Sequence, residues 1–361
     1  GLHIVDWICI AIYAAIVLGV GWIYSRRQSD RGSYFIGNGK MNSFIIGISI
    51  YATLLSSASY LMIPGEIIKH GPVILCYLFA IPIAYLIVGY ILIPALMRHR
   101  VISAYQILEK TLGMKIRILG ASLFIMLRLT WMSVIVYFAA EATVVIVGLD
   151  PSMLPWVILV IGIISVTYTT MGGLQAVVMT DLLQFCVLFG GAILTLVVIS
   201  FRLKGIHWIP LEWSPNWDIQ PFFSFDPTVR VTVFGSITLF LIWLICMGGA
   251  DQTVIQRYMS TKDVVTARRA YFRNSLTNII TMSLIALIGF AVLEFYTQYQ
   301  YYIPKGESIQ TYADKLFPLF ISQHLPIGIA GLVVSALFAA GMSSIDSGIN
   351  SITAVITTDF L

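Results

Sequence analysis

A group of polar side chains interrupts an apolar segment near the end of the chain. The segment FAAGMSSIDSGINSI, residues 338–352, places serines, an aspartate and an asparagine between the apolar runs GIAGLVVSALF and ITAVI. Ala340, Ser343, Ser344 and Ser347 follow the spacing i, i+3, i+4, i+7, so in a helix they share one face. Hydroxyl and free carbonyl oxygens are hard, neutral ligands suited to a hard cation. The alternative is structural, because such serines also bond to their own helix or allow close helix packing.

The amino-acid composition indicates that this helix lies in a lipid membrane. Of 361 residues, 58% are hydrophobic and 11% are charged, and the mean hydropathy is +0.90. A soluble domain is about 25% charged. Apolar runs such as VILCYLFAIPIAYLIVGYILIPALM reach the roughly 20 residues that a spanning helix needs. The pattern predicts an all-α polytopic membrane protein, in which unpaired polar groups are costly and the cluster must therefore have a partner.

Nine membrane spans are predicted. They cover residues 3–24, 42–68, 72–97, 118–147, 152–171, 175–201, 232–258, 268–296 and 325–357, and the amphipathic stretch VISAYQILEKTLG lies between the third and fourth. The loops on one side of these spans carry 14 Lys and Arg residues, those on the other side carry six, and Arg128 lies inside a span. This bias predicts a multi-pass protein of the plasma membrane whose first loop is cytoplasmic and whose N-terminus is outside the cell.

Several classes of function are disfavoured. The four cysteines lie within predicted spans and have no CxxC spacing, so they indicate neither a metal centre nor a disulfide framework. The sequence shows no nucleotide-binding loop and no hydrolytic motif, and we therefore expect neither an enzyme nor transport driven by ATP within this chain. The net charge of +4 follows from the loop bias, and no nucleic-acid partner is expected.

Two predicted spans carry the signs of a broken helix. The second reads FIIGISIYATLLSSASYLMIPG and is rich in small hydroxyl residues over 53–59; the seventh has Gly248 and Gly249 followed by Asp251 and Gln252. Consecutive glycines weaken a helix by roughly 1 kcal/mol each, which predicts an unwound segment, although a kink or close helix packing is the alternative. The two spans run in opposite directions, the pattern of an inverted repeat whose broken helices build a transport site at the midplane.

These motifs resemble the sodium/solute symporter family. YTTMGGLQA (168–176) is similar to the first family signature, and GGADQTVIQRY (248–258) is similar to the second. SDRGSYFIGNGKM, ATLLSSAS, AVVMTDLLQF and AAGMSSIDSGINS resemble family segments too. The resemblance covers nearly the whole chain and is closer to the branch of sialic acid and monocarboxylate carriers than to the sugar carriers. It implies a LeuT-type fold of two five-helix inverted repeats after one extra helix.

On this template, residues 1–361 form a single transmembrane domain. Residues 3–24 are the extra N-terminal helix, 42–201 form the first repeat with core helices one to five, and 232–357 hold core helices six to eight. A complete second repeat has five core helices. We therefore expect core helices nine and ten to be absent from this sequence, which would make it a fragment.

The resemblance also implies a sodium ion (Na+) as the bound cation. In the family, two backbone carbonyls of the first core helix join one carbonyl and two serines of the eighth. The matching residues here are Ala52, Leu55, Ala340, Ser343 and Ser344.

The substrate is expected between the two broken helices, near Ser56, Ser59, Asp251 and Gln252. Arg128 lies about 16 Å into its span at 1.5 Å per residue, and an arginine at that depth requires a partner inside the bundle. That partner is either a substrate carboxylate, held as a bidentate pair, or a protein acid such as Asp251.

Three other polar residues of the spans receive lesser roles. Glu141 is expected to line a vestibule or to pack between helices, and Gln256 and Arg257 are read as a family feature at the inner end of the seventh span.

Two acids suggest a second cation. In family members with an additional sodium site, the aspartate matching Asp181 joins hydroxyls of the eighth core helix; this sequence has Asp346 at the first of those positions and keeps Ser347 at the next. Two nearby carboxylates cannot both stay ionised in a low-dielectric site without a cation, so a sodium bridges them or they share a proton. Otherwise Asp346 faces a different helix. The hypothesis is a cation between Asp181, Asp346 and Ser347.

Together these features predict a sodium-coupled symporter that carries a small organic solute, such as a carboxylate, across a lipid bilayer by alternating access. A monomer would suffice for transport, and an oligomer is compatible with it. The alternatives are a proton-coupled carrier of the same fold, a sugar carrier, a leak channel and the input domain of a membrane sensor.

Overall fold

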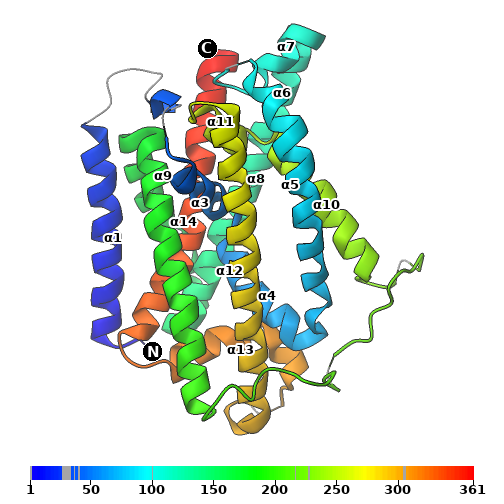
Figure 1. The fold of residues 1–361 in the computed structure, drawn as a ribbon. Helices are drawn as coiled ribbons and strands as arrows, with labels where there is room; N and C mark the ends of the chain where they lie inside the picture. Colours follow the sequence, from blue (N-terminus) through cyan, green and yellow to red (C-terminus); the bar gives the residue numbers. More distant parts are fainter. Residues whose placement is uncertain are drawn as a thin grey trace.

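The computed structural model describes residues 2–26, 34–35, 37–39, 41–99, 101–215, 217–226, 228–303 and 306–361. These residues form helices joined by loops, with no β-strand among them. Figure 1 shows the long helices running roughly side by side. Five of the basic residues counted in the charge bias lie outside the described residues: Arg27, Arg31, Lys40, Arg100 and Lys305.

Most predicted spans are present. In the described part of the chain, seven helices are long and apolar enough to cross a membrane: Ile4–Tyr24, Pro72–Met97, Met114–Val147, Gly172–Arg202, Val233–Ala250, Val264–Gln298 and Ile329–Phe360. A bent helix pair makes an eighth span, and the predicted span 152–171 corresponds to a shorter apolar helix, Pro151–Thr167. The all-helical membrane architecture is therefore confirmed.

The first half of the chain begins with α1 (Ile4–Ser25), α3 (Ser43–Leu54) and α4 (Ser57–His70). The third span comprises a 3-10 segment (Pro72–Phe79), α5 (Ala80–Ile87), a π-helical turn (Val88–Leu92) and α6 (Ile93–Met97). The amphipathic stretch contains α7 (Gln106–Leu112), which is followed by α8 (Met114–Val147). The order of these elements along the chain matches the predicted order of the spans.

The fifth and sixth predicted spans form one ribbon, α9 (Leu154–Arg202), with a kink at Gly173. The backbone of Gly173 has φ 56° and ψ −164°, a conformation that residues with a Cβ rarely adopt. The second half of the chain contains α10 (Val233–Ala250), α11 (Gln252–Met259), α12 (Val264–Gln298) and α14 (Ile329–Val355), which continues as a π-helical turn, Ile356–Phe360.

Helix α13 (Ile309–His324) was not predicted. Its 16 residues are too few for a span, and Pro318 interrupts its apolar pattern, but Phe317 and Phe320 are fully buried and the helix packs on α4 and α12. Burial and the nearby charge of Arg202 lower the pKa of His324, at the end of this helix, to about 4. The imidazole is therefore neutral at pH 7 and packs as a ring against its aromatic neighbours.

Helix α14 lies at the centre of the bundle. In the most apolar 18-residue stretch of this span 83% of the residues are buried, whereas in the other candidate spans the corresponding share is 50% or less. It packs against α9, α8, α1, α3 and α4 (Figure 1). The serine cluster of α14 therefore faces protein on several sides, which allows its hydroxyls to find partners.

A buried carboxylate fixes α1 to the beginning of α14. Asp6 is 2% exposed, and its Oδ1 accepts hydrogen bonds from the backbone N–H of Gly328 at 2.7 Å and of Gly331 at 2.9 Å. A Cβ at Gly331 would lie 2.5 Å from the Asp6 Cα, so the close approach requires glycine there. The negative charge also complements the positive end of the helix dipole.

We expect Asp6→Ala to lower the free energy of unfolding by about 0.5–2 kcal/mol, the usual cost of losing a helix cap. Thermal unfolding of the purified protein in detergent measures the effect. Glu141→Gln is the matched control, because Glu141 is exposed on α8 and its change should stay within about 0.5 kcal/mol. Equal midpoints for the two variants would contradict the role assigned to Asp6.

Candidate functional site

The second span is broken between α3 and α4. The two helices are bent by 67°, and Leu55 and Ser56 between them have extended backbones. The Ser56 Oγ accepts a hydrogen bond from the backbone N–H of Ser59 at 3.1 Å and so caps α4. The last carbonyls of α3 have no partner in a following helical turn and are available to other groups. The break predicted within residues 53–59 is confirmed, at Leu55 and Ser56.

The serines of α14 face this break. The Ser344 hydroxyl lies 3.0 Å from the carbonyl oxygen of Thr53 and 3.0 Å from that of Leu55. A small cavity beside these contacts is lined by Ala52, Leu55, Gln184, Phe185, Leu188, Ala339, Ala340 and Ser343. All five residues predicted for the sodium site therefore lie together, four on the cavity wall and Ser344 bonded to the broken helix.

The chemistry of this place suits a monovalent hard cation. Its oxygens are neutral carbonyl and hydroxyl groups, and they converge from two separate helices, α3 and α14. An ion held by neutral oxygens in this way is bound by dipoles rather than by full charges. The alternative that these serines only bond to their own helix does not hold for Ser344, which bonds to the Thr53 carbonyl of α3 and to the Leu55 carbonyl just after it.

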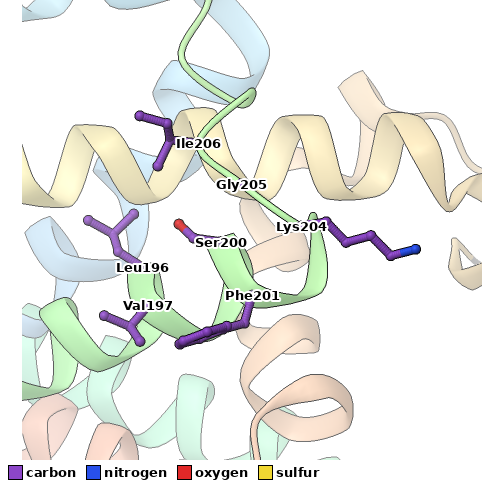
Figure 2. Close-up of a pocket in the computed structure, with 7 residues that line it drawn as sticks. All are labelled: Leu196, Val197, Ser200, Phe201, Lys204, Gly205 and Ile206. Atoms are coloured by element: carbon purple, nitrogen blue, oxygen red, sulfur yellow. The ribbon is translucent and has the colours of Figure 1, made fainter.

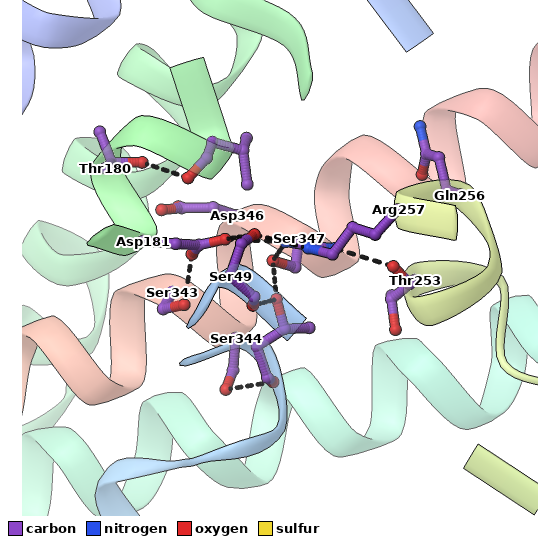
Figure 3. A network of polar contacts seen from close by, with 12 residues as sticks. Ser49, Thr180, Asp181, Thr253, Gln256, Arg257, Ser343, Ser344, Asp346 and Ser347 are labelled. Atoms are coloured by element: carbon purple, nitrogen blue, oxygen red, sulfur yellow. Dashed lines mark hydrogen bonds and ion pairs between the residues drawn. The ribbon is translucent and has the colours of Figure 1, made fainter. Parts of the chain in front are cut away.

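A buried ion pair adjoins the cavity (Figure 3). Asp181, on α9, is fully buried; its Oδ1 accepts a hydrogen bond from the Ser343 hydroxyl at 2.5 Å, and its Oδ2 lies 2.9 Å from Nη2 of Arg257. The Ser49 hydroxyl also donates to Oδ2. Ser343 therefore belongs to the cavity wall and to the ion pair at once.

Arg257 lies within this network, which corrects its assignment as a feature of the span end. Its guanidinium donates to the Ser347 Oγ at 2.6 Å, to the Ser49 Oγ at 2.7 Å and to the Thr253 carbonyl oxygen at 2.8 Å. Every residue of the short helix α11 is buried, so the side chain of Arg257 lies inside the bundle. The neighbouring Gln256 bonds instead to the Phe35 carbonyl and to Ser351.

Two of the three residues predicted for a second cation, Asp181 and Ser347, share the guanidinium of Arg257. Ser347 adjoins Asp181 through the shared guanidinium and bonds to the Thr53 hydroxyl at 2.8 Å. The Oδ1 of Asp346 accepts a hydrogen bond from the Thr169 hydroxyl of α9 at 2.9 Å. The guanidinium of Arg257 therefore places a positive charge between Asp181 and Ser347.

The second break lies later than predicted. Helix α10 runs through Gly248 and Gly249 to Ala250, and only Asp251 has an extended backbone before α11. A Cβ at Gly248 would lie 2.8 Å from the Val88 side chain, and one at Gly249 would lie 2.6 Å from Leu92. The glycines therefore serve close helix packing, and the prediction that they unwind was wrong.

Arg128 pairs with a protein acid. Its Nη2 lies 2.8 Å from Oδ2 and 2.9 Å from Oδ1 of Asp251, and 2.8 Å from the Thr253 hydroxyl. Arg128 is 4% exposed, and the Asp251 side chain is 11% exposed. Of the two alternatives left open for this arginine, the protein partner is the one present in the structure. The pair fixes α8 to the break between α10 and α11.

The other residues predicted to bind substrate have different hydrogen-bond partners. The Gln252 side chain accepts from the Ala104 N–H and donates to the Ile102 carbonyl, both at 2.7 Å, so it anchors the loop before α7. The Ser56 and Ser59 hydroxyls lie 3.2 Å from each other at the start of α4. Glu141 is exposed on α8. The structure therefore leaves Ser56 and Ser59 as the candidates not committed to another helix.

A larger cavity of about 560 Å³ lies at the C-terminal end of α9 (Figure 2). It is lined by Leu196, Val197, Ser200, Phe201, Lys204, Gly205 and Ile206. Figure 2 shows the Lys204 side chain extending away from the others, and the Ser200 hydroxyl accepts a hydrogen bond from Trp208. Because a ligand site needs converging polar groups, this apolar cavity is not the candidate site.

Comparisons with known proteins identify relatives of this chain. The model of the sodium:solute symporter family matches residues 34–361. The chain is 31% identical to the sodium/sialic acid symporter SiaT of Proteus mirabilis, over 96% of this chain and 69% of that protein. It is 28% identical to the sodium/sialic acid symporter NanT of Aliivibrio fischeri, over 98% and 69%. A solved substrate-bound, outward-open Na+-coupled sialic acid symporter matches with TM-score 0.84 and 28% identity, over 100% of this chain and 74% of that one.

Proposed function

The chain belongs to the sodium:solute symporter family, and from this premise we propose where it binds sodium and which solute it carries. It is a multi-pass membrane protein and a sodium-coupled solute symporter. The expected likeness to the sialic acid branch is confirmed by its relatives. Its family consists of transporters, and we assign it no enzymatic activity.

The proposed sodium site lies between α3 and α14 and comprises Ala52, Leu55, Ala340, Ser343 and Ser344. The observation that carries this proposal is the contact of the Ser344 hydroxyl with the Thr53 and Leu55 carbonyls at the helix break. A sodium ion in this site would bind the Ser344 hydroxyl and the Leu55 carbonyl and so connect the two helices. The Ser343 proton points to Asp181, which leaves the oxygen lone pairs for the cation.

Sodium in this place would couple to the solute through the broken helix. It would hold the α3–α4 break against α14 and stabilise the form in which the solute site next to the break is assembled. Binding is then reciprocal, because what sodium does for the affinity of the solute, the solute must do for that of sodium. An inward membrane potential contributes about 2.3 kcal/mol per charge per 100 mV to this cycle.

The proposed solute is a sialic acid or a related small carboxylate. The support is the assignment of sialic acid symport to the relatives and the chemistry of the α4 terminus, where the Ser56 and Ser59 hydroxyls adjoin the positive end of a helix dipole. Asp251 engages Arg128, so the solute carboxylate is assigned to the serines rather than to the arginine.

The rest of the architecture is proposed on the same template. Residues 42–201 would form the first inverted repeat and 232–357 would belong to the second, within one transmembrane domain that works as a monomer in the plasma membrane with its N-terminus outside. The second cation at Asp181, Asp346 and Ser347 stays a prediction; Arg257 contacts Asp181 and Ser347.

Uptake into proteoliposomes tests the proposed solute. With an inward sodium gradient we expect sialic acid to accumulate and glucose not to accumulate, and we expect Ser59→Ala to raise the KM for sialic acid by about tenfold through loss of one hydrogen bond. Accumulation that follows a pH gradient and ignores sodium would favour the proton-coupled alternative. Accumulation of glucose alone would favour a sugar carrier.

A further inference from the structure

A further cavity lies between α1 and the rest of the bundle. Figure 1 shows α1 at the edge of the molecule, next to α9. The cavity has a volume of about 310 Å³, which is within the size range of ligand pockets. Its wall is formed by α1, the C-terminal end of α8, the first half of α9 and the back of α14, and includes Trp7, Ala14, Trp156, Val160, Phe338 and Met342.

The lining suits an apolar ligand. Among the described lining residues only Thr143 and Tyr13 carry a hydroxyl. The Thr143 hydroxyl donates to the Ala139 carbonyl of its own helix at 2.7 Å, and the Tyr13 hydroxyl lies beside Gln184. A cavity without free polar groups does not hold water and binds apolar molecules instead.

The apolar molecules around this cavity are lipids. Its rim is open on the outside of the bundle, where Trp156 is 62% exposed and Val160 is 55% exposed. In a bilayer these side chains face hydrocarbon, because the surrounding helices are apolar segments of membrane length or shorter apolar helices. Those helices cover Ile4–Tyr24, Met114–Val147, Pro151–Thr167 and Ile329–Phe360.

The cavity is elongated along the helix axes. Its lining extends from Trp7 to Ala14 on α1, about 10 Å at 1.5 Å per residue, and from Trp156 to Ile164 on α9, about 12 Å. This shape matches an extended acyl chain that lies parallel to the spans. Leu149 and Met153, in the connection between α8 and α9, line the end where the headgroup of such a lipid would lie.

Negative charge marks this headgroup end. Asp150 lies between the two lining residues of the connection and is exposed. Its carboxylate accepts a hydrogen bond from the Ser152 N–H at 2.9 Å, and hydrogen bonds from Ser152 lower the pKa of the carboxyl, so it is ionised at pH 7. The segments that form the wall, residues 2–25, 129–201 and 325–361, contain no Lys or Arg. This charge favours a headgroup with a positive amine over an anionic one.

We propose that this cavity is a lipid site that binds one acyl chain of phosphatidylethanolamine, whose ammonium group pairs with Asp150. A primary ammonium can donate hydrogen bonds to the carboxylate, which a choline headgroup cannot do. The inference requires only that the chain spans a bilayer. It is independent of the proposed sodium and solute sites.

The bound chain would contact the helix that carries the serine cluster. Phe338 and Met342 of α14 line the lipid cavity, whereas Ala339, Ala340 and Ser343 line the small cavity beside the helix break. The two sets occupy different faces of the helix. The acyl chain would therefore pack on α14 from the side opposite the break.

Photolabelling of the purified full chain in dodecyl maltoside tests the proposal. The probe is phosphatidylethanolamine with a diazirine in the middle of one acyl chain, and mass spectrometry locates the label, which we expect within residues 7–14, 153–164 and 338–342. Ala14→Trp fills the cavity and should lower this labelling about tenfold. Ala15→Trp is the matched control, because Ala15 is exposed on α1 and does not line the cavity, and it should leave the labelling unchanged.

Competition by unlabelled lipids tests the headgroup. Unlabelled phosphatidylethanolamine should displace the probe about fivefold more effectively than phosphatidylglycerol does. Asp150→Asn removes the charge and keeps an oxygen that can cap the turn Pro151–Met153, so it should abolish this preference without unfolding the connection.

Equal labelling of Ala14→Trp and Ala15→Trp would overturn the lipid site, and so would displacement of the probe by cholesterol but not by phosphatidylethanolamine. Equal competition by the two phospholipids in the unchanged protein would overturn the role of Asp150. If Ala14→Trp does not fold, Val160→Trp on the rim decides, with Leu159→Trp as its control, since Leu159 is 50% exposed and does not line the cavity.

Discussion

Ser344→Ala is expected to raise the sodium concentration for half-maximal uptake by about 5–150-fold, which corresponds to the loss of about 1–3 kcal/mol of binding. The Ser344 hydroxyl bonds to the carbonyls of Thr53 and Leu55, so its removal deletes one oxygen of the proposed site and the contact that joins α14 to the helix break. Ser343→Ala should have a similar effect, because Ser343 lines the cavity and bonds to Asp181.

The matched control is Ser335→Ala in the same helix. Ser335 is 1% exposed, and its hydroxyl bonds to the Gly331 carbonyl of its own helix at 2.9 Å, away from the break. This variant tests the cost of losing any buried serine from α14. If the sodium curves of Ser343→Ala and Ser344→Ala coincide with that of Ser335→Ala at equal expression, the assignment of the sodium site fails.

The second large effect is expected at Arg128. Arg128→Ala should destabilise the protein by about 3–5 kcal/mol, the cost of leaving one partner of a buried ion pair unpaired. The Asp251 carboxylate would remain nearly enclosed and would keep its hydrogen bonds from the Thr253 hydroxyl and N–H. Fluorescence-detected size-exclusion chromatography and thermal unfolding in detergent measure the loss of folded protein.

A double variant separates the ion pair from a solute contact. Arg128→Met with Asp251→Asn removes both charges and keeps a side chain that caps α11, so it should recover most of the stability lost in Arg128→Ala. A stable Arg128→Ala protein with a strongly raised KM for the solute would show instead that this arginine binds substrate. A stable and fully active Arg128→Ala protein would exclude both roles.

The sequence predicts the parts of the fold that depend on local composition. The nine apolar segments are evident because lipid requires a long apolar run for each span. The break at Leu55 is evident because small hydroxyl residues interrupt such a run without charges that would place it in a loop. The proposal of the first sodium site rests on the serine spacing of α14 together with the family resemblance.

What the sequence does not predict depends on tertiary contacts. Gly248 and Gly249 look like an unwound segment, yet Val88 and Leu92 pack against them and the break moves to Asp251. Helix α13 has mixed polarity because one of its faces packs on α4 and α12. Arg257 lies in the segment that resembles the second family signature, but the sequence does not indicate its partners Asp181, Ser49 and Ser347.

The measurement that tests sodium coupling most directly is the Kd of sialic acid for the purified protein with and without sodium. The proposed site predicts that sodium lowers this Kd, that sialic acid lowers the sodium Kd by the same factor, and that Ser344→Ala removes most of both effects, since binding linkage is reciprocal. A sialic acid Kd that is the same in sodium and in choline, for protein that binds both ligands, would contradict the account.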